Sequence, residues 1–575
     1  MPDDTVLLER HFDTAFAAPD GIQKLRELIL TLAMQGKLVP QDPKDQPASE
    51  LLKEIEVEKQ RLLKKGKIKQ PKPLPAIQAE EVSYSIPQGW EWVRLGNIGE
   101  INPRNTFDDD TDTGFVPMPL IFSEYGSIHK FQTRKWSEIK KGYTHFADGD
   151  VALAKITPCF ENGKSCVFKN LPNGIGAGTT ELHIFRNTFN AIHPEYLLAY
   201  FKNPKYIASG TLKMTGSAGQ KRVPTEFFTL NPFPLPPLAE QRRIVTKIDR
   251  LMARCDELEK LRAERNQKRI TVHTAALDRL LNAKESDNFS TAWHFITQHF
   301  GELYSVKEDV AELRKAILQL AVMGKLVPQD PTDEPASELL RAIAAKKQRL
   351  VKEKKLKIGQ LTNDSKSTNA NIAIPSSWSW VKGIDLFFIT KLAGFEYTEH
   401  IILLDIGEVP VIRAQNVKPF KLNVDNLKYI DLNTSKLLER CSLTKAALLV
   451  TFIGAGIGDV ALFDFQERWH LAPNVAKMEP FSGCENKVNL KYIAYFLNSS
   501  VGRNEIFKHL KSTAQPSISM GTIRDIDYPL PPLPEQHRIV TKIDQLMALC
   551  NHLDQQIDAA TGKQSALLNA VMAQV

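Results

Sequence analysis

The sequence contains little cysteine, and its apolar residues are nowhere gathered into a long run. Only six of the 575 residues are cysteine and none forms a CxxC pair, so we expect neither a disulfide framework nor a zinc ribbon. No stretch approaches the about 20 apolar residues of a membrane span, and the acidic first residues do not resemble a secretory signal. These absences predict a cytoplasmic protein without a membrane segment.

A large excess of one charge is also missing. Lys and Arg total 74 and Asp and Glu total 67, which gives a formal net charge of +7. This balance argues against a strongly basic tail, but it permits a polyanion as a partner. With 42% hydrophobic residues over this length, the chain has enough apolar material for several domains with cores of their own.

The common motifs of catalysis and cofactor binding are incomplete. Residues 454–458, GAGIG, lack the GxGxxG spacing and precede a strand-like run instead of a helix. Gly163-Lys164-Ser165 ends like a phosphate-binding loop, but Pro158 stands where its first glycine should be. Residues 231–234, NPFP, lack the second proline of the NPPF-type motif of amino-methyltransferases, and no HExxH is present. We therefore expect no catalytic residue, no metal site and no cofactor on this chain.

The chain contains two copies of a frame. Residues 25–60 resemble residues 313–348 at a constant offset of 288, including GKLVPQDPKD against GKLVPQDPTD. Residues 234–252, PLPPLAEQRRIVTKIDRLM, resemble residues 529–547, PLPPLPEQHRIVTKIDQLM, at an offset of 295. The segments between these blocks show little identity to each other. Two variable modules thus lie inside a duplicated constant frame, which suggests that the modules differ in what they recognise.

The order of the blocks predicts where the termini lie. In the middle of the chain the PLPPLxEQ block leads through a helix into the GKLVPQDP block, whereas at the ends the two blocks are separated. The ends can reproduce the central arrangement only if the C-terminus meets the N-terminus. We therefore predict a pseudo-twofold, circular layout.

The frame is helical by its periodicity. Apolar residues step by four and three along the stretch after each PLPPLxEQ block, which is the pattern of a coiled-coil seam, although an ordinary helical core has the same signature. A second helix in each copy should end at Gly36 or Gly324. The residues predicted to form the spacer helices or to dock partners are Ile244, Ile248, Leu251, Leu258, Leu313, Ile317, Leu320, Ile539, Ile543, Leu546 and Leu553.

Each variable module begins with Ile-Pro-x-x-Trp-x-Trp-Val and continues in short β-rich runs at 150–156, 181–185, 410–417, 446–454 and 459–463. These runs are separated by Gly, Asn and Pro, which predicts a twisted sheet with long loops. A helical stretch follows, at 194–203 and 490–499, and then a polar run, KMTGSAGQKRVP or HLKSTAQPSIS.

Polar side chains of the modules could contact DNA. Arg and Lys can read guanine and Gln can read adenine in the major groove, while a solvated surface is the alternative for each residue. The candidates are Lys213, Gln220, Lys221, Arg222, Arg413, Gln415, Lys508, Lys511 and Gln515. The basic linkers at 64–75 and 352–368 are either solvated linkers or phosphate contacts.

The duplicated PLPPLxEQ and GKLVPQDP blocks, the heptad helices and the alternation of constant and variable regions closely resemble the specificity (S) subunit of type I restriction–modification enzymes, the HsdS family. The resemblance covers almost the whole chain. It implies an α+β protein with two α/β target recognition domains separated by long antiparallel coiled-coil helices. The implied regions are 1–80 (constant helices), 81–235 (first recognition domain), 236–370 (central coiled coil), 371–528 (second recognition domain) and 529–575 (C-terminal helix pairing with the N-terminal region).

The resemblance also implies the partners and the division of labour. Double-stranded DNA is bound, and each recognition domain reads one half of an asymmetric bipartite site. Two modification (methyltransferase) subunits carry S-adenosylmethionine, restriction (endonuclease and translocase) subunits use ATP and Mg, and this chain is non-catalytic. A self-contained modification enzyme and a coiled-coil scaffold that binds only proteins are the alternatives that the residues leave open.

Overall fold

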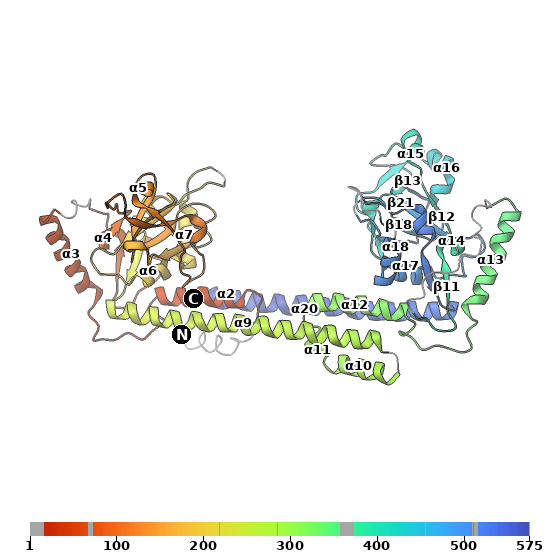
Figure 1. The fold of residues 1–575 in the computed structure, drawn as a ribbon, viewed down its shortest axis with the longest axis horizontal. Helices are drawn as coiled ribbons and strands as arrows, with labels where there is room; N and C mark the ends of the chain where they lie inside the picture. Colours follow the sequence, from red (N-terminus) through yellow and green to blue (C-terminus); the bar gives the residue numbers. More distant parts are fainter. Residues whose placement is uncertain are drawn as a thin grey trace. The chain divides into compact units, whose positions relative to one another are not determined.

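The structure is a computed structural model that describes residues 16–66, 73–217, 219–283, 286–356, 373–454, 456–508, 510 and 516–573. The chain forms two compact units. Unit 1 comprises Met1–Asn266 with Ala559–Val575, and unit 2 comprises Gln267–Asp558. Two long helices, α9 (Leu238–Asn282) and α20 (Leu533–Ala573), each contribute one part to either unit (Figure 1). No helix among the described residues is long and apolar enough to span a bilayer.

Unit 1 contains a module of two four-stranded sheets. One has the order β2 (Glu100–Ile101), β9 (Leu182–Arg186), β6 (Val151–Ala154), β7 (Ser165–Val167), and the other has β4 (Gln132–Lys135), β3 (Asp112–Val116), β8 (Ile175–Gly178), β5 (Thr144–Ala147). The β3–β8 pair is parallel and its neighbours are antiparallel. Strand β1 (Glu91–Arg94) pairs with β10 (Pro232–Leu235) and joins the two ends of the module.

Unit 2 repeats this topology. Its sheets have the orders β12 (Phe387–Lys391), β21 (Val475–Pro480), β18 (Ala447–Thr451), β19 (Val460–Phe463) and β16 (Lys428–Ile430), β13 (Val409–Ile412), β20 (Trp469–Leu471), β17 (Ser442–Leu443). Again one central pair, β13–β20, is parallel. Strand β11 (Ser379–Lys382) pairs with β22 (Asp527–Leu530), and a short hairpin of β14 (Val417–Lys418) and β15 (Lys421–Leu422) is added. The two modules thus share one fold despite little sequence identity. Each predicted β-rich run contains a strand, but within the run 410–417 the residues after β13 form a 3-10 turn, η5 (Ala414–Asn416).

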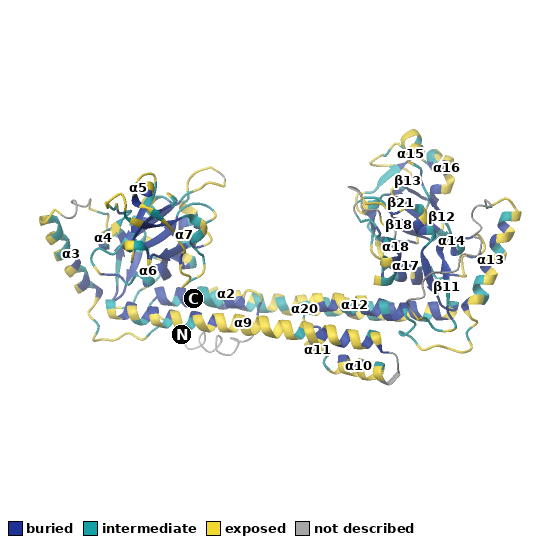
Figure 2. Cartoon of the chain, viewed as in Figure 1, coloured by how far each residue is buried: buried dark blue, intermediate teal, exposed yellow. Residues whose placement is uncertain are grey.

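The cores of the modules are built from alternating and continuous apolar strands. In Figure 2 the strands of both modules are largely buried, and the outer loops are exposed. One helix of each module lies against a sheet, α6 (Pro194–Phe201) in unit 1 and α17 (Leu490–Asn498) in unit 2. The next helix, α7 (Pro204–Lys213) or α18 (Ser500–Phe507), contacts that helix. A further helix, α8 (Thr225–Leu230), precedes β10, and α19 (Met520–Arg524) precedes β22. The two helical stretches predicted from the sequence are confirmed as α6 and α17.

The helical frame of unit 1 has α2 (Gly21–Met34) packed on α9. Arg26 pairs with Asp256 at 2.7 Å, and Arg262 donates to the Ala18 carbonyl at 3.0 Å, so α2 and α9 run antiparallel. The end of α20 packs on α2 and the residues just before it, because Leu568 is buried against Phe16, Ala18 and Leu28. The C-terminal helix therefore lies on the N-terminal region, as the block order predicted.

In unit 2 the two long helices exchange these roles. Helix α12 (Lys307–Val322) is antiparallel to α20, since Lys307 pairs with Asp558 at 2.6 Å and Arg314 with Asp554 at 2.9 Å. It is parallel to α9, because Arg269 pairs with Asp309 while Lys325 donates to the Leu281 carbonyl at 2.9 Å. Helices α9 and α20 are thus antiparallel to each other, as predicted.

Most of the predicted seam is packed. Ile244, Ile248, Ile317, Leu320, Ile539 and Ile543 are buried, and Leu251, Leu313, Leu546 and Leu553 pack partly buried against the same cores. Leu258 lies on α9 but is 46% exposed, so it does not pack in the seam, and its role in docking a partner stays a prediction. Its counterpart Leu553, at the same heptad position on α20, packs partly buried, so the spacing along the helix does not by itself decide burial.

The predicted glycine stops are confirmed, and packing explains them. Gly36 and Gly324 have φ of +68° and +67°, which favours glycine after a helix. A Cβ on Gly36 would lie 2.3 Å from Pro87 Cγ, and one on Gly324 would lie 2.4 Å from Pro375 Cγ. The glycine of each GKLVPQDP block therefore allows close contact with the Ile-Pro that begins the module.

Two helices flank the modules. Helix α3 (Ala48–Lys64) follows the first GKLVPQDP turn, and α13 (Ala336–Lys352) follows the second. Unit 2 also contains α10 (Ser286–Gln298) and α11 (Phe300–Leu303) before α12. The remaining helices and 3-10 turns are short: η1 (Ala79–Glu81), α4 (Leu95–Ile98), η2 (Met118–Leu120), α5 (Trp136–Ile139), η3 (Pro172–Gly174), α14 (Gly383–Leu386), α15 (Gly394–His400), η5 (Ala414–Asn416), α16 (Leu432–Leu437) and η6 (Glu439–Cys441).

Candidate nucleic-acid interface

The polar run of the first module packs beside the turn between β6 and β7. The Thr157 amide donates to the Lys221 carbonyl at 2.9 Å, and the Val223 amide donates to the Lys155 carbonyl at 2.8 Å. The run also folds back on itself, since the Arg222 amide donates to the Thr215 carbonyl at 2.8 Å. Residues 155–164 and the described residues of 214–222, which are far apart in the sequence, therefore form one edge of the module.

The second module repeats this juxtaposition. The Ile518 amide donates to the Phe452 carbonyl at 2.9 Å, and Ile453 forms an isolated bridge with Ser517. This places the described end of the second polar run beside the turn between β18 and β19. Gly454, Gly456 and Gly458 of the GAGIG segment belong to that turn, and all three have positive φ. The turn leads into strand β19, as the strand-like run after it predicted.

Three candidates of the first module have free side chains. Lys213 ends α7, and Gln220 and Lys221 lie on the polar run; all three are exposed and form no side-chain hydrogen bond or ion pair within the described part of the chain. Lys155, at the end of β6, was not among the sequence candidates. Its backbone holds the polar run in place, and this role is visible only when the two segments are seen together.

Arg222 has a different role. Its guanidinium forms a two-pronged contact with Glu181, with Nε and Nη2 each 2.9 Å from a carboxylate oxygen. The contact raises the pKa of Arg222 and lowers the pKa of Glu181. A base edge would have to compete with this pair, so Arg222 is better placed to hold the loop against β9 than to read DNA.

The candidates of the second module are dispersed. Lys508 pairs with Glu505 at 2.8 Å and also donates to the Asp525 carbonyl at 2.8 Å, so its charge is neutralised within the module. Arg413 follows β13 and donates to the Asn426 carbonyl at 2.7 Å. Gln415 lies nearby in η5 and is exposed. Lys511 and Gln515 lie outside the described residues. A DNA contact of any of these residues stays a prediction.

A buried polar clamp ties the module of unit 1 to its frame. Glu240, on the first turn of α9, accepts a hydrogen bond from Trp90 Nε1 at 3.0 Å and another from Gln41 Nε2 at 2.7 Å. Arg243 pairs with Asp45 at 2.6 Å. Burial raises the pKa of Glu240, and the two hydrogen bonds oppose that rise.

Unit 2 contains the same clamp. Glu535 accepts from Trp378 Nε1 at 3.0 Å and from Gln329 Nε2 at 2.6 Å, and Arg538 pairs with Asp333 at 2.6 Å. The three repeated blocks, GKLVPQDP, IPxxW and PLPPLxEQ, therefore meet at one point in each unit. The sequence analysis did not foresee these contacts, although the repetition of Gln, Asp, Trp, Glu and Arg in both copies was the available signal.

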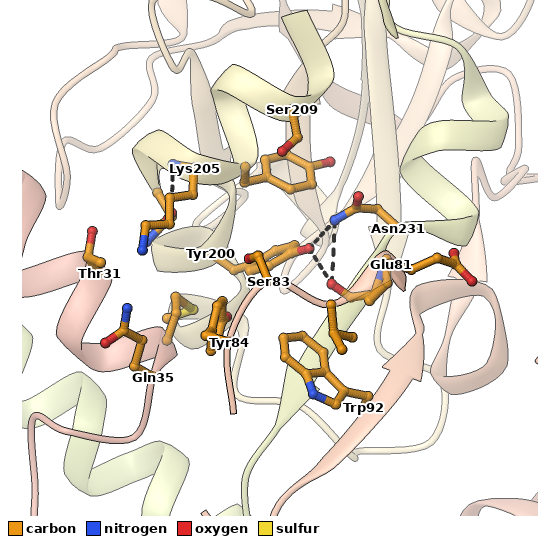
Figure 3. A pocket seen from close by; sticks show the side chains of 15 residues that line it. Thr31, Gln35, Glu81, Ser83, Tyr84, Trp92, Tyr200, Lys205, Ser209 and Asn231 are labelled. Atoms are coloured by element: carbon orange, nitrogen blue, oxygen red, sulfur yellow. Dashed lines mark hydrogen bonds between the residues drawn. The ribbon is translucent and has the colours of Figure 1, made fainter. Parts of the chain in front are cut away.

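A small cavity of about 80 Å³ lies in unit 1 (Figure 3). Its wall includes Tyr84, Tyr200 and Tyr206, and the hydroxyl of Tyr200 donates to the Pro232 carbonyl at 2.7 Å. Burial raises the pKa of Tyr84 and Tyr206. The lining contains no arrangement of nucleophile and base, and the described residues contain no group of three His, Cys, Asp or Glu that could hold a metal ion.

The comparisons agree with this architecture. A family model described as the type I restriction modification DNA specificity domain matches residues 87–267 and 377–560. The chain is 40% identical to the type I restriction enzyme EcoAI specificity subunit of Escherichia coli, over 96% of this chain and 93% of that protein. It is 37% identical to the EcoEI specificity subunit of the same species, over 96% and 93%.

One solved structure supports the fold. It concerns complex assembly and conformational transition of the type I R-M system, and one of its chains matches with a TM-score of 0.50 and 17% identity, covering 86% of this chain and 98% of that chain. Two divergent recognition modules in a duplicated helical frame define a DNA-specificity protein. The chain belongs to the family of type I restriction–modification specificity subunits. It is a non-catalytic subunit that recognises DNA as part of a larger complex.

Proposed function

We propose that each module reads one half of an asymmetric bipartite DNA site. One observation carries the proposal: the same edge is built twice, from a polar run packed on a β-turn, but with different side chains. The first edge presents Lys213, Gln220 and Lys221, whereas the second contains the Gly-rich turn. Two equivalent surfaces of different chemistry suit a site whose halves differ in sequence.

The helices are proposed to set the distance between the half-sites. An antiparallel pair of α9 and α20 supplies segments to both units, and a helix advances about 1.5 Å per residue. Two readers joined by such a spacer bind bivalently, and the spacer decides which separations of half-sites both readers can occupy.

The helices are also proposed to dock two modification subunits. Apolar side chains on α9 support this idea, because Leu258 and Leu261 in unit 1 are 46% and 53% exposed, and Ile270 and Val272 in unit 2 are 40% and 43% exposed. Exposed apolar groups on a helix are typical of interaction surfaces. The modification subunits would carry S-adenosylmethionine and extrude the target adenine, while restriction subunits using ATP and Mg would join this core.

An exchange of modules tests the proposal. Residues 81–235 are replaced by the corresponding module of another specificity subunit, and methylated adenines are mapped in cells with the matching modification subunit. We expect one half of the methylated site to change and the other to stay the same. A change in both halves would contradict the assignment of one reader to each half.

Two further measurements address the alternatives. Methylation by the purified chain alone would favour a self-contained modification enzyme. Binding to random duplex DNA across a salt series separates the DNA-binding role from a purely protein-binding scaffold. A scaffold predicts no binding even with the modification subunit present, or binding that does not depend on salt.

A further inference from the structure

A stripe of cations lies on the outer face of α9 in unit 1, at a distance in sequence from the candidate interface. It consists of Arg242, Lys247, Arg250 and Arg254, and we call it the α9 stripe. All four side chains are exposed or half-buried, and none forms an ion pair within the described residues. Arg242, Arg250 and Arg254 are separated by eight and four residues, so they lie near one another along one side of the helix.

The surroundings leave these charges available. Arg243, next to Arg242, is neutralised by Asp45 at 2.6 Å. Beyond Arg254 the acidic residues Asp256 and Glu259 pair with Arg26, at 2.7 Å and 2.9 Å. A shallow groove of about 330 Å³ runs beside Arg242, Lys247 and Arg250, with Val39 in its wall. The stripe is therefore a local concentration of positive charge beside an open groove.

The second copy of the frame lacks this feature. The residues that match Arg242, Lys247, Arg250 and Arg254 on α20 are His537, Lys542, Gln545 and Leu549. Only one of the four cations is retained, Lys542. The surrounding residues 240–241 and 243–249 are nevertheless identical to residues 535–536 and 538–544. Leu549 is 64% exposed, so this position is on the surface in both units.

This difference bears on the kind of partner. If two modification subunits dock equivalently on the two copies of the frame, their surface should be the same in both. A stripe present in only one copy is therefore not part of such a shared docking surface, and its unpaired positive charge is complementary to the phosphates of a duplex. The distance from Arg242 to Arg254 is about 18 Å along the helix, comparable to about five base pairs of duplex.

We propose that the α9 stripe binds the sugar–phosphate backbone of double-stranded DNA. The stripe contributes affinity and salt dependence but no sequence discrimination, because phosphates are the same at every base pair. The inference rests on the proposed function to the extent that it assumes a DNA-binding chain with two equivalently docked modification subunits. It adds a contact surface on the helical frame, outside both reading edges.

The test uses the full chain assembled with its modification subunits and a duplex that contains the methylated site. The variant R242H/R250Q/R254L gives α9 the residues that α20 already carries at these positions. The control R265Q/K268Q/R279Q removes three charges from exposed positions elsewhere on α9. A second variant, R242K/R250K/R254K, retains the charge. Dissociation constants are measured between about 50 and 200 mM KCl, and thermal melting checks that each variant is folded.

We expect R242H/R250Q/R254L to make the slope of log K against log salt shallower by up to about 2.7, with site-specific and random duplexes affected alike. Between about 50 and 200 mM KCl the unmodified chain should therefore lose up to about 40-fold more affinity than this variant loses. The lysine variant and the control should keep the original slope.

Several results would overturn the inference. An unchanged slope in R242H/R250Q/R254L would show that the stripe makes no phosphate contacts. An equal change of slope in the control would show that the effect comes from net charge alone. Weaker assembly with the modification subunits at an unchanged slope would assign the stripe to an acidic protein surface. If the unmodified complex did not distinguish its site from random DNA, the proposed function would fail, while the slope comparison would still test the stripe.

Discussion

At the scale of single residues, the two buried glutamates of the clamps matter most for stability. Glu240 and Glu535 are each 1% exposed, and a buried carboxylate without hydrogen-bond donors is costly. The indole N–H of a tryptophan and the amide of a glutamine satisfy it in both units. Since the blocks that provide these groups are repeated, the same contact holds each module on its frame.

Removing one donor should destabilise each unit by a similar amount. Trp90→Phe and Trp378→Phe preserve an aromatic ring but leave a carboxylate oxygen without its indole partner, which we expect to cost about 1–3 kcal/mol. Hydrogen exchange measured by mass spectrometry resolves the two units and should show faster exchange only in the unit that carries the change. Trp293→Phe, at a 42% exposed position on α10, is the control. Equal exchange in variant and unmodified chains would contradict the role of the clamp.

Two buried histidines make stability depend on pH. Burial lowers the pKa of His183 on β9 and of His470 on β20 to about 4, from an ordinary value of 6.5. Between these values the unfolded chain binds protons that the folded chain does not. Stability therefore falls as the pH drops from about 6.5 towards 4, by up to about 3 kcal/mol for each histidine.

His183→Gln tests this dependence. Glutamine can still donate to the Val223 carbonyl, which His183 Nε2 contacts at 2.9 Å, but it does not titrate. Melting temperatures at pH 7.5 and 5.5 should differ less in the variant than in the unmodified chain. Parallel losses in the two proteins would mean that His183 is not a source of the acid sensitivity.

At the scale of elements, the two copies of the helical frame differ in one contact between helices. In unit 1 this contact is apolar, with Phe16 and Leu568 buried together. The matching positions in unit 2 are Tyr304 and His273, whose rings meet edge to face at 5.1 Å beside the pair of Arg269 with Asp309. A buried polar cluster thus replaces an apolar contact in one of two otherwise similar helix packings.

The cluster should respond differently to partial and complete replacement. Asp309→Ala leaves Arg269 without its carboxylate, and we expect a loss of about 3–5 kcal/mol in unit 2, as for other broken buried pairs. The quadruple change R269Q/H273L/Y304F/D309G installs the residues of unit 1 and should be much less harmful than the single change. The stabilities of the two variants are compared by urea unfolding, with hydrogen exchange in α12 as the local readout. A quadruple variant as unstable as Asp309→Ala would contradict this reading.

The sequence predicted the periodicity of each element, but it did not predict all of the contacts that the element makes. The step of four and three residues predicted the long helices, and alternation predicted β6, β9, β13, β18 and β19. Leu258 shows the limit, since it continues the heptad but lies 46% exposed. A heptad describes only the spacing of side chains, whereas burial also needs a facing helix at that level.

At the scale of the whole molecule, the length of the spacer should set the gap between half-sites. One heptad inserted in both α9 and α20, at residues 266 and 558, adds about 10 Å of helix and keeps the phase of the seam. We expect the gap in the methylated site to lengthen by up to about three base pairs, with both half-sites unchanged. Mapping of methylated adenines checks this, and insertion in α9 alone, which breaks the pairing, is the control. An unchanged gap would rule out the helices as the spacer.

The sequence by itself determined the duplicated frame, the two divergent modules, the helical and strand segments and the meeting of the chain ends. These features follow from repeats and periodicities, which are local or are copied along the chain. The tertiary structure alone decided which polar side chains remain free. Arg222 is engaged by Glu181, 41 residues away, and Lys508 meets the Asp525 carbonyl 17 residues away, whereas Gln220 and Lys221 stay exposed. Ion pairs depend on neighbours that only folding brings together, so a list of basic residues cannot distinguish a DNA contact from a support of the loop.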